Sequence, residues 1–563
     1  MKRKVTVGHA IAAFLEGCGV KAAFGVISIH NMPILDAIAE RGAIRFVSAR
    51  GEAGAASMAD ACARTTGALG VVITSTGTAA GNAAGGMVEA LTAGTPLLHI
   101  TGQIETPYLD RDLAYIHEAP DQLTMLGAIS KQAWRVRSAA TALSTFREAV
   151  RCAQTAPTGP VSVEVPIDIQ AELIDLPDDL APHEPMVTQP SPHDIERLAE
   201  ALASARRPLL WLGGGARAAG HAVARLVAMG FGVVSSTQGR GIVAEDHPAS
   251  LGAYNVAGPV EAFYQTCDAV LVVGSRLRGN ETLKYQLKLP RPMFRIDADP
   301  SADGRCYESQ VFVCADASLA LEALADRLEG RLQVAPEFAA DLRRAHDQAV
   351  AGLRDGLGPY AALVDALQAH SGRQFNWVRD VTVSNSTWGN RELRIFDPRA
   401  GVHALGGGIG LGLAMAIGAA IGAAEHSTGR RTLLLAGDGG FVLNLGELAC
   451  AVQEKAAITI VLMNDRGYGV IKNIQDAQYG GRKVYADLHT PDYTLMAQSM
   501  GFAHRRITSL ADAGAALQAL SNEPGPAMLE VDMLAAGRFK TAFAGPPVKA
   551  AAATGPASAA KPA

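Results

Sequence analysis

The sequence is poor in charge and carries no long run of one sign. Only 19% of its 563 residues are Asp, Glu, Lys or Arg, and 50 basic against 55 acidic side chains give a net charge of −5. This balance argues against a nucleic-acid-binding protein. Because 48% of the residues are hydrophobic, the chain is also unlike a disordered protein, and its length predicts roughly three or four folded domains.

Cysteine is scarce and irregularly placed. The seven cysteines are odd in number, and no two of them stand in a CxxC spacing. We therefore expect reduced thiols and a cytoplasmic protein rather than a zinc site or a disulfide framework. Near the N-terminus, His9, Glu16 and Gly19 interrupt the apolar run that a signal peptide needs, so this segment predicts an amphipathic helix.

Long apolar runs are few, and one of them imitates a membrane span. Residues 404–424 hold no charged side chain over 21 positions, which is long enough to cross the hydrocarbon core of a bilayer. Seven of these positions are glycine, as is typical of loops and of helices that approach a neighbouring backbone closely. We therefore predict a loop followed by a packed core helix, and no membrane-spanning segment.

Proline-rich segments divide the chain into blocks. We place one linker at residues 173–194, where prolines interrupt every helical or strand period, and a second at residues 331–359. Residues 544–563 are dominated by Ala, Pro and Gly and predict a disordered tail. The predicted domains are an N-terminal one at 1–172, a central one at 195–330 and a C-terminal one at 360–543.

Within each block, short apolar runs alternate with Ala-rich helical patterns. In the C-terminal block, for example, the apolar residues 432–436 precede a helical pattern at 445–455. Strand, turn and helix in repetition predict an α/β fold with three doubly wound parallel-sheet domains. Ligands of such domains bind at the carboxyl ends of the strands.

Two acidic residues follow neighbouring apolar strands of the C-terminal block. The first strand ends at Asp438, within a Gly-Asp-Gly-Gly sequence, and the second ends at Asp465, 27 positions later. This spacing fits one strand–helix–strand unit, which would bring both carboxylates to one edge of a sheet. Hard oxygen ligands of this kind suit Mg²⁺, and the glycines let backbone N–H groups approach a diphosphate. The alternative is a pair of ordinary turns with acidic helix caps.

The Gly-Asp-Gly sequence, followed by Asn-Asp at this spacing, resembles the thiamine-diphosphate-binding motif of the acetolactate synthase, pyruvate decarboxylase and benzoylformate decarboxylase family. The resemblance implies that the side chains of Asp438 and Asp465 and the backbone carbonyl of Gly467 hold Mg²⁺. It also implies a pyrimidine-binding domain, a central Rossmann-like domain and a diphosphate-binding domain. Asp465 stands where the motif usually has Asn, and it adds a negative charge beside the diphosphate.

Further cofactor contacts follow from the same resemblance. In the family a bulky apolar side chain wedges between the two rings of the cofactor, and Ile409 occupies that position here, with plain core packing as the alternative. Gly407 would offer its carbonyl to the 4′-amino group of the aminopyrimidine. Ser386 and Thr387 resemble hydroxyl donors to the diphosphate. The remaining expected contacts come from the diphosphate motif: Gly437, Gly439, Gly440 and Tyr468.

The N-terminal block supplies the expected acid–base group. Glu52 follows a predicted strand and opens a helix, where an isolated Glu is usually a surface residue favoured by the helix dipole. Its surroundings resemble the family segment whose Glu binds N1′ of the pyrimidine and thereby promotes proton removal from the thiazolium C2. Burial against the ring would serve this role by raising the pKa of the carboxyl group. Asn82 matches an Asn of the family's next helix and is expected to bind the cofactor.

Two histidines mark the expected substrate side. His30 lies at a place similar to that of a histidine in benzaldehyde lyase, and His117 stands where acetolactate synthases carry Gln, similar to the histidines of decarboxylase active sites. Either residue could instead be structural. We assign catalytic roles to both. The expected substrate-pocket residues are Ile29, Asn31 and Ile474, the last of which replaces a Trp of the anabolic synthases.

The resemblance covers roughly residues 5–540 and implies a thiamine-diphosphate-dependent 2-oxo acid decarboxylase or carboligase, acetolactate-synthase-like, that acts through a C2 ylide and an enamine. One alternative is a decarboxylase of aromatic 2-oxo acids or a 2-hydroxy ketone lyase, of the benzoylformate decarboxylase or benzaldehyde lyase type. Another is a catalytically silent cofactor-binding assembly protein. Residues 274–282 differ from the FAD-dependent synthases, so we expect no required FAD.

Because family members join the two halves of the site across a subunit interface, we expect a homodimer or homotetramer. We expect a small-molecule substrate and neither a nucleic-acid nor a membrane partner.

Overall fold

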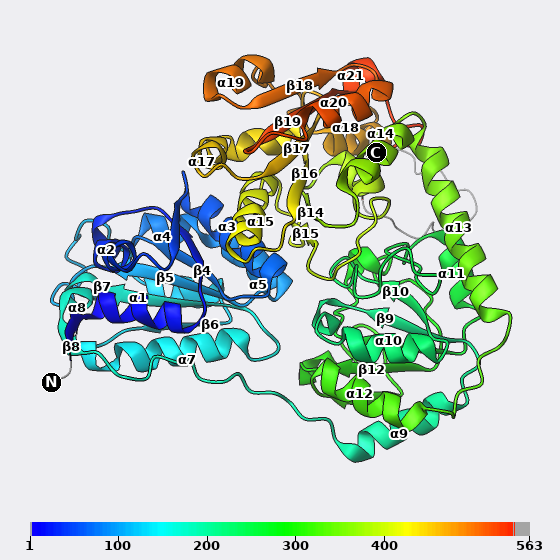
Figure 1. Cartoon of the computed structure of the whole chain (residues 1–563), viewed down its shortest axis with the longest axis horizontal. Helices are drawn as coiled ribbons and strands as arrows, with labels where there is room; N and C mark the ends of the chain where they lie inside the picture. The colour runs from blue at the N-terminus through cyan, green and yellow to red at the C-terminus, as the bar shows by residue number, and fades with distance from the viewer. Residues whose placement is uncertain (1–2, 544, 546–563) are drawn as a thin grey trace, which may run out of the picture.

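The computed structural model describes residues 3–543 and 545, and within them the chain builds three α/β domains, each around a parallel sheet (Figure 1). The predicted fold class is therefore confirmed. In Figure 1 the N-terminal domain lies at the left, the central domain at the lower right and the C-terminal domain above and between them.

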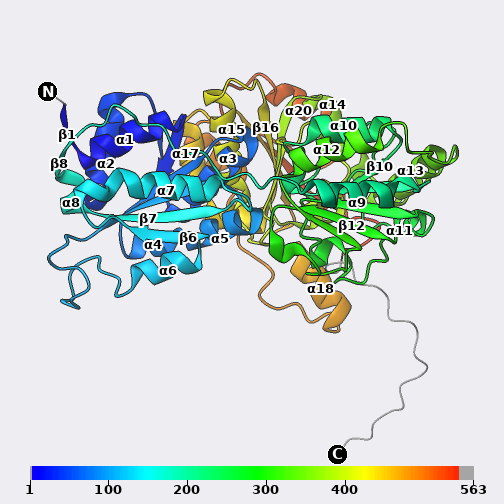
Figure 2. The same ribbon diagram turned by 90° about the horizontal axis from the view of Figure 1, so that it is seen from below.

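The N-terminal sheet has the strand order β3-β2-β4-β5-β7-β6, and all of its neighbours are parallel. Its central strands β4, β5 and β7 are buried along their whole length, and helices cover both faces of the sheet. Helices α1, α2 and α7 lie on one side, and α4 and α6 lie on the other (Figure 2). The strands are β2 (Ala22–Gly25), β3 (Arg45–Ser48), β4 (Gly70–Thr74), β5 (Leu97–Gln103), β6 (Gln132–Arg135) and β7 (Pro160–Pro166). The helices are α1 (Val7–Gly17), α2 (Met32–Arg41), α3 (Glu52–Thr66), α4 (Thr78–Asn82), α5 (Ala84–Ala93), α6 (Gln122–Ala128), α7 (Ala142–Gln154) and α8 (Ile167–Ala171), with short turns η1 (Ile29–Asn31) and η2 (Ala139–Thr141).

The central sheet has the order β10-β9-β11-β12-β13, again with parallel neighbours. Its strands are β9 (Pro208–Leu212), β10 (Gly232–Ser235), β11 (Ala269–Val273), β12 (Met293–Asp297) and β13 (Val311–Cys314). Its helices are α9 (Pro192–Ala203), α10 (Gly220–Ala228), α11 (Gly258–Tyr264), α12 (Ala317–Leu328) and α13 (Phe338–Leu357), with short turns η3 (Gly214–Ala216), η4 (Gly279–Glu281) and η5 (Pro300–Ala302).

The C-terminal sheet has the order β15-β14-β16-β17-β19-β18, and its neighbours are parallel. Its strands are β14 (Phe375–Arg379), β15 (Gly401–His403), β16 (Arg431–Gly437), β17 (Ile458–Asn464), β18 (Ala503–Ile507) and β19 (Ala527–Asp532). Its helices are α14 (Tyr360–Ser371), α15 (Gly412–Glu425), α16 (Asp438–Phe441), α17 (Glu447–Gln453), α18 (Gly469–Gln478), α19 (Tyr493–Met500), α20 (Ala513–Leu520) and α21 (Met533–Ala536), with short turns η6 (Asn385–Gly389), η7 (Val442–Asn444) and η8 (Leu510–Asp512).

The N-terminal and C-terminal domains share one hydrophobic core. Helices α3 and α15 pack against each other, and the buried cluster around them includes Met58 from the first domain and Ile417 from the last. Both helices are rich in Ala and Gly, which allows the close approach: a Cβ atom on Gly418 would lie 2.0 Å from the carbonyl oxygen of Met58. The glycine-rich run at 404–424 is thus a loop followed by a packed core helix, as predicted.

The structure differs from the sequence-based expectation in the two linkers. Residues 331–359 contain α13, whose apolar residues at helical spacing are buried, and Phe338 stacks on Phe263 with ring centroids 5.6 Å apart. The surrounding charged residues obscured this period in the sequence. Within 173–194, residues Leu173–Asp175 form β8, which pairs antiparallel with β1 (Lys4–Thr6), and α9 begins at Pro192.

The predicted tail at 544–563 lies, apart from Gly545, outside the described residues. In the part of the chain that the structure describes, no helix is long and apolar enough to cross a membrane.

Candidate cofactor site

Two carboxylates meet at the carboxyl edge of the C-terminal sheet. The parallel neighbours β16 and β17 end side by side, so Asp438 at the start of α16 and Asp465 just after β17 come together. Asp438 is fully buried, and its two carboxylate oxygens accept hydrogen bonds from the backbone N–H groups of Asp465 (3.2 Å) and Gly467 (2.9 Å). These bonds fix the turn after β17 against the start of α16.

The carboxyl group of Asp465, which is partly buried, lies within hydrogen-bonding reach of the buried Asp438 carboxyl group. Burial raises the pKa of Asp438, and burial together with the neighbouring Asp438 carboxylate raises the pKa of Asp465 to about 7. A divalent cation between them would remove this repulsion and supply the solvation that burial takes away. The donor set therefore fits Mg²⁺, which the two side chains and the Gly467 carbonyl would hold.

The glycines of this edge leave room for a ligand close to the backbone. A Cβ atom on Gly439 would lie 2.8 Å from the carbonyl oxygen of Gly467 and equally close to the ring of Tyr468, so a larger residue at 439 would push this turn away. Gly437 forms the N-cap of α16, which begins at Asp438, and Gly440 lies in its single turn. The backbone N–H groups of a glycine-rich turn suit a diphosphate.

Ile409 lies beside this edge, on a glycine-rich loop. It is 39% exposed, and its side chain contacts the backbone at Gly440, with Cγ1 3.2 Å from the place of a Cβ on that residue. An apolar side chain that remains partly exposed is available to pack against a bound ring. Gly407, two residues earlier, has φ +79°, a conformation that favours glycine.

Asp380 organises this loop, and we did not single it out from the sequence. Its buried carboxylate accepts the N–H groups of Gly410 (2.9 Å) and Gly412 (3.3 Å), and burial raises its pKa to about 6. Asn444 binds the carbonyl of Gly410 at 2.8 Å. Asp380 follows the apolar strand β14, as Asp438 follows β16, and that repeated position was a signal in the sequence.

Ser386 and Thr387 lie in η6, a turn of π-helix that follows β14. The hydroxyl of Thr387 donates to the carbonyl oxygens of Val383 (2.9 Å) and Ser384 (3.0 Å), so it is engaged within the turn. Ser386 is half-buried. Lys472, which the sequence analysis did not select, bonds the carbonyl oxygens of Asp465 (3.3 Å) and Arg466 (3.1 Å) and holds the turn near the paired carboxylates.

Glu52 and Asn82 come together in the N-terminal domain. Glu52 is the first residue of α3 and partly exposed, and the side-chain amide of Asn82, at the end of α4, donates to its carboxylate at 3.1 Å. Two positions before Glu52, the backbone N–H of Arg50 donates to both carboxylate oxygens of Glu447 at 3.1 Å. Glu447 is buried, which raises its pKa, and it ties the start of α3 to the C-terminal domain.

The structure also brings the two predicted histidines together. The rings of His30 and His117 lie edge to face with centroids 5.2 Å apart. His30 is buried, and burial together with His117 lowers its pKa. His117 is exposed, so the pair has one buried ring and one ring open to solvent.

The remaining substrate-side predictions have different settings. Ile29 is 67% exposed and directly precedes His30 in the chain. Asn31 is buried, and its amide bonds the backbone of its own loop at Ser28 (2.8 Å) and Val26 (2.9 Å), so it shapes the turn. Ile474 lies on α18, half-buried, in the C-terminal domain.

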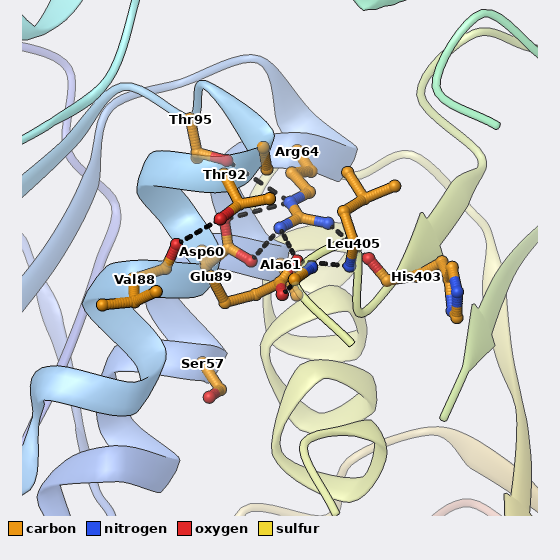
Figure 3. A network of polar contacts seen from close by, with 12 residues as sticks. Ser57, Asp60, Ala61, Arg64, Val88, Glu89, Thr92, Thr95, His403 and Leu405 are labelled. Carbon is orange, nitrogen blue, oxygen red and sulfur yellow. Dashed lines mark hydrogen bonds and ion pairs between the residues drawn. The ribbon is translucent and has the colours of Figure 1, made fainter. Parts of the chain in front are cut away.

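A buried ion-pair network joins the N-terminal domain to the loop that carries Gly407 (Figure 3). Arg64 of α3 contacts Asp60 at 2.7 Å and Glu89 of α5 at 2.9 Å, and it donates to the carbonyl oxygen of His403 at 2.8 Å. The side chains of Arg64, Asp60 and Glu89 are at most 2% exposed. No sequence signal other than the position of these residues on Ala-rich helices pointed to this network.

A separate cavity of about 400 Å³ lies where the three domains meet. Glycine-rich turns after β9 and β11 and several arginines line it, among them Arg64, Arg217, Arg276, Arg278, Arg305 and Arg399. Among the described residues, the cavity lining includes none of those predicted to bind thiamine diphosphate. It is therefore distinct from the edge that holds Asp438 and Asp465.

Comparison with known proteins agrees with this architecture. Residues 5–125 match the thiamine pyrophosphate enzyme N-terminal TPP binding domain, residues 195–324 the central domain and residues 382–531 the C-terminal TPP binding domain. The chain is 29% identical to a probable 2-ketoarginine decarboxylase of Pseudomonas aeruginosa, over 94% of each chain. It is 27% identical to acetolactate synthase isozyme 1 large subunit of Escherichia coli, over 94% of each chain, and 27% identical to acetolactate synthase 2 of Zea mays, over 92% of this chain and 84% of the relative.

The three matched domains follow one another in the order of the three sheets, and each predicted cofactor contact described above lies in one of the two TPP-binding domains. This chain belongs to the thiamine pyrophosphate enzymes: it is a thiamine-diphosphate-dependent enzyme with carbon–carbon bond lyase or transferase chemistry.

Proposed function

We propose that this enzyme decarboxylates a 2-oxo acid and passes the remaining acyl unit to a proton or to a second carbonyl compound, as an acetolactate-synthase-like carboligase or decarboxylase. The observation that carries the proposal is the pair of neighbouring carboxylates at the carboxyl ends of adjacent parallel strands, the buried Asp438 and the partly buried Asp465. With Mg²⁺ between them, this edge would bind the diphosphate of the cofactor. The relatives named as acetolactate synthases and as a probable 2-ketoarginine decarboxylase support both outcomes.

When bound, thiamine diphosphate supplies the electron sink that stabilises the carbanion left by decarboxylation. The chain's own groups orient it and move protons. The carbonyl oxygen of Gly407 would accept a hydrogen bond from the 4′-amino group, and Ile409 would separate the two rings of the cofactor. Glu52 would hold a proton at N1′ of the pyrimidine. The pair His30 and His117 would exchange protons with the substrate oxygens, since imidazoles can act as acid and base in catalysis.

The site is completed by a second copy of the chain. Glu52 bonds Asn82 in its own domain, whereas Asp438 bonds the turn after β17 in the C-terminal domain. The N-terminal domain also exposes large apolar side chains near the histidine pair: Ile27 (57%), Ile29 (67%), Met32 (47%) and Ile116 (71%). A partner subunit would cover this surface, which favours a homodimer or homotetramer.

Mixing two inactive variants tests the shared site. E52Q and D438N homo-oligomers should each be inactive, whereas a hetero-oligomer contains one site in which both residues are native. We expect mixing with subunit exchange to restore activity. Because one of the two sites in a heterodimer is native, the activity averaged over its sites should reach about half of the native value. An active monomer in analytical ultracentrifugation, or no restoration in a verified hetero-oligomer, would contradict the shared site.

Product analysis separates the substrate classes. With thiamine diphosphate and Mg²⁺ present, pyruvate, benzoylformate and 2-ketoarginine are supplied separately, and CO₂, aldehyde and 2-hydroxy ketone products are measured. Acetolactate from pyruvate supports the leading proposal, whereas benzaldehyde from benzoylformate supports the alternative, an aromatic decarboxylase or 2-hydroxy ketone lyase. If the enzyme binds the cofactor and turns over none of these, the 2-oxo acid assignment fails. That result would support the alternative of a catalytically silent cofactor-binding assembly protein.

Two further expectations accompany the proposal. We propose that the enzyme needs no FAD, and a flavin absorbance band in protein purified under native conditions would refute this. We also propose a cytoplasmic location, on the basis of the scattered spacing of the seven cysteines in the sequence.

A further inference from the structure

The loop at residues 404–410 depends on contacts from outside itself. Four of its seven residues are glycine, at 406, 407, 408 and 410, so few side chains are present to pack it in one conformation. Glycine loses more backbone entropy on ordering than any other residue. Ile409 is 39% exposed and contributes little burial to the protein alone. Hydrogen bonds to the backbone must therefore fix the loop.

Glu89 supplies two of these bonds at the start of the loop (Figure 3). One carboxylate oxygen accepts the N–H of Leu405 and the other accepts the N–H of Gly406, both at 2.7 Å. Charge-assisted bonds of this length are about twice as strong as neutral ones. A Cβ on Gly406 would lie 2.9 Å from the same carboxylate, so the glycine permits the close approach.

The position of Glu89 is itself fixed. The side chain is 2% exposed and extends from α5 of the N-terminal domain, where Arg64 binds one of its oxygens at 2.9 Å. Arg64 also bonds the carbonyl of His403, the residue at which β15 ends and the loop begins. Arg278 of the central domain donates to the carbonyl oxygen of Leu405 at 3.4 Å. The backbone N–H and C=O of Leu405 are thus held from two domains other than its own.

We infer that Glu89 is a positioning residue for the cofactor: by fixing the 405–406 peptides it presents the Gly407 carbonyl and the Ile409 side chain to the bound coenzyme. The inference rests on the proposed cofactor role of this loop. It assigns to the N-terminal domain a second contribution to catalysis besides Glu52, made within one chain through the backbone of the C-terminal domain.

The substitution Glu89→Gln tests this inference. The Gln oxygen can accept one of the two N–H groups, but its NH₂ group donates and so opposes the other. We expect thiamine diphosphate to bind about ten- to a hundredfold more weakly, measured by calorimetry with Mg²⁺ present. In the cofactor-free protein, hydrogen exchange at residues 404–410 should accelerate at least tenfold.

Glu245→Gln is the matched control. Glu245 is also a buried carboxylate, paired with Arg240 at 2.6 Å, and it accepts the N–H of Ile395 in the C-terminal domain at 2.8 Å. E245Q therefore removes the same chemistry from an interdomain contact that does not touch the loop. It should change the melting temperature but leave cofactor affinity and loop exchange unchanged.

A shorter acid separates positioning from folding. Glu89→Asp keeps the charge next to Arg64 but cannot reach both N–H groups, so its stability should stay near that of the native protein while cofactor affinity falls. If native protein binds the cofactor and E89Q binds it equally well, the inference is wrong. If E89Q and E89D both unfold while E245Q folds, Glu89 is a structural residue and the inference is also overturned. If native protein binds no cofactor, the proposed function fails instead.

Discussion

Replacing Asp465 with Asn should stabilise the metal-free protein at alkaline pH. Burial and the neighbouring Asp438 carboxylate raise the pKa of Asp465 to about 7, above the value of 3.8 for an unhindered group. The folded state therefore binds more protons than the unfolded state between these two values, and stability falls as pH rises from about 4 to 7. About three pKa units at ~1.4 kcal/mol each correspond to at most ~4 kcal/mol above pH 7.

Asn fits the same space without the charge, so D465N should recover about 2–4 kcal/mol of stability at pH 8 and almost none at pH 4. Thermal unfolding in chelator is the assay. Because ~1 kcal/mol shifts the melting temperature of a domain of this size by about 2–4 °C, the gain at pH 8 should reach several degrees.

Magnesium supplies the internal control for this prediction. In the proposed site Mg²⁺ would bind the folded protein through both carboxylates, so it should raise the melting temperature of the native protein more than that of D465N and close the gap between them. Equal melting temperatures of the two metal-free proteins at pH 8 would show that the carboxylates do not repel each other as described. A gap that Mg²⁺ leaves unchanged would show that the metal binds elsewhere.

Three further predictions address catalysis, domain contact and pH. Glu52→Gln should lower turnover about 10²–10⁴-fold. Its melting temperature should be unchanged, because the Glu52 carboxylate is partly exposed. An equal loss of turnover in the surface control Glu40→Gln would contradict a specific role of Glu52. Arg64→Met leaves two buried carboxylates without their cation and should lower the free energy of unfolding by about 3–5 kcal/mol. The ion pairs of Arg45 with Glu425 and Glu454 are partly exposed, so Arg45→Met should lower it by under about 1 kcal/mol. Equal losses of stability in thermal unfolding would refute the comparison. Burial lowers the pKa of His99 to about 4, so this histidine stays neutral in the folded state while the unfolded chain takes up a proton. Stability is therefore lost as pH falls from 6.5 to 4, by about 2 kcal/mol at pH 5. His99→Gln should reduce the drop in melting temperature between pH 7 and 5, and the exposed-site control His221→Gln should not.

The fold and the diphosphate edge were accessible from the sequence because both follow from local pattern. An apolar run that ends at a glycine and an acid predicted β16, and one that ends at Asn-Asp predicted β17. The spacing of 27 residues between the two acids predicted that the strands are neighbours. The same logic placed Glu52 at the start of α3. The functional roles of these residues stay predictions, since they depend on a bound cofactor.

The parts that sequence reasoning missed depend on contacts between distant segments. Glu89 receives the N–H groups of a loop more than 300 positions later, and Glu447 binds the backbone at Arg50. No local period marks a carboxylate whose partners are backbone groups of another domain. α13 was missed for a different reason, because its buried stripe is narrow and lies among charged residues that are typical of a solvent-exposed segment.

The packing of α3 on α15 also bears on biosynthesis. About 350 residues separate the two helices along the chain. At translation rates of ~5–20 residues per second, the small-residue face of α3 waits roughly 20–70 s for the helix that covers it. During that interval the nascent N-terminal domain offers an uncovered apolar surface, so its solubility on the ribosome depends on chaperones or on slow emergence rather than on its own stability.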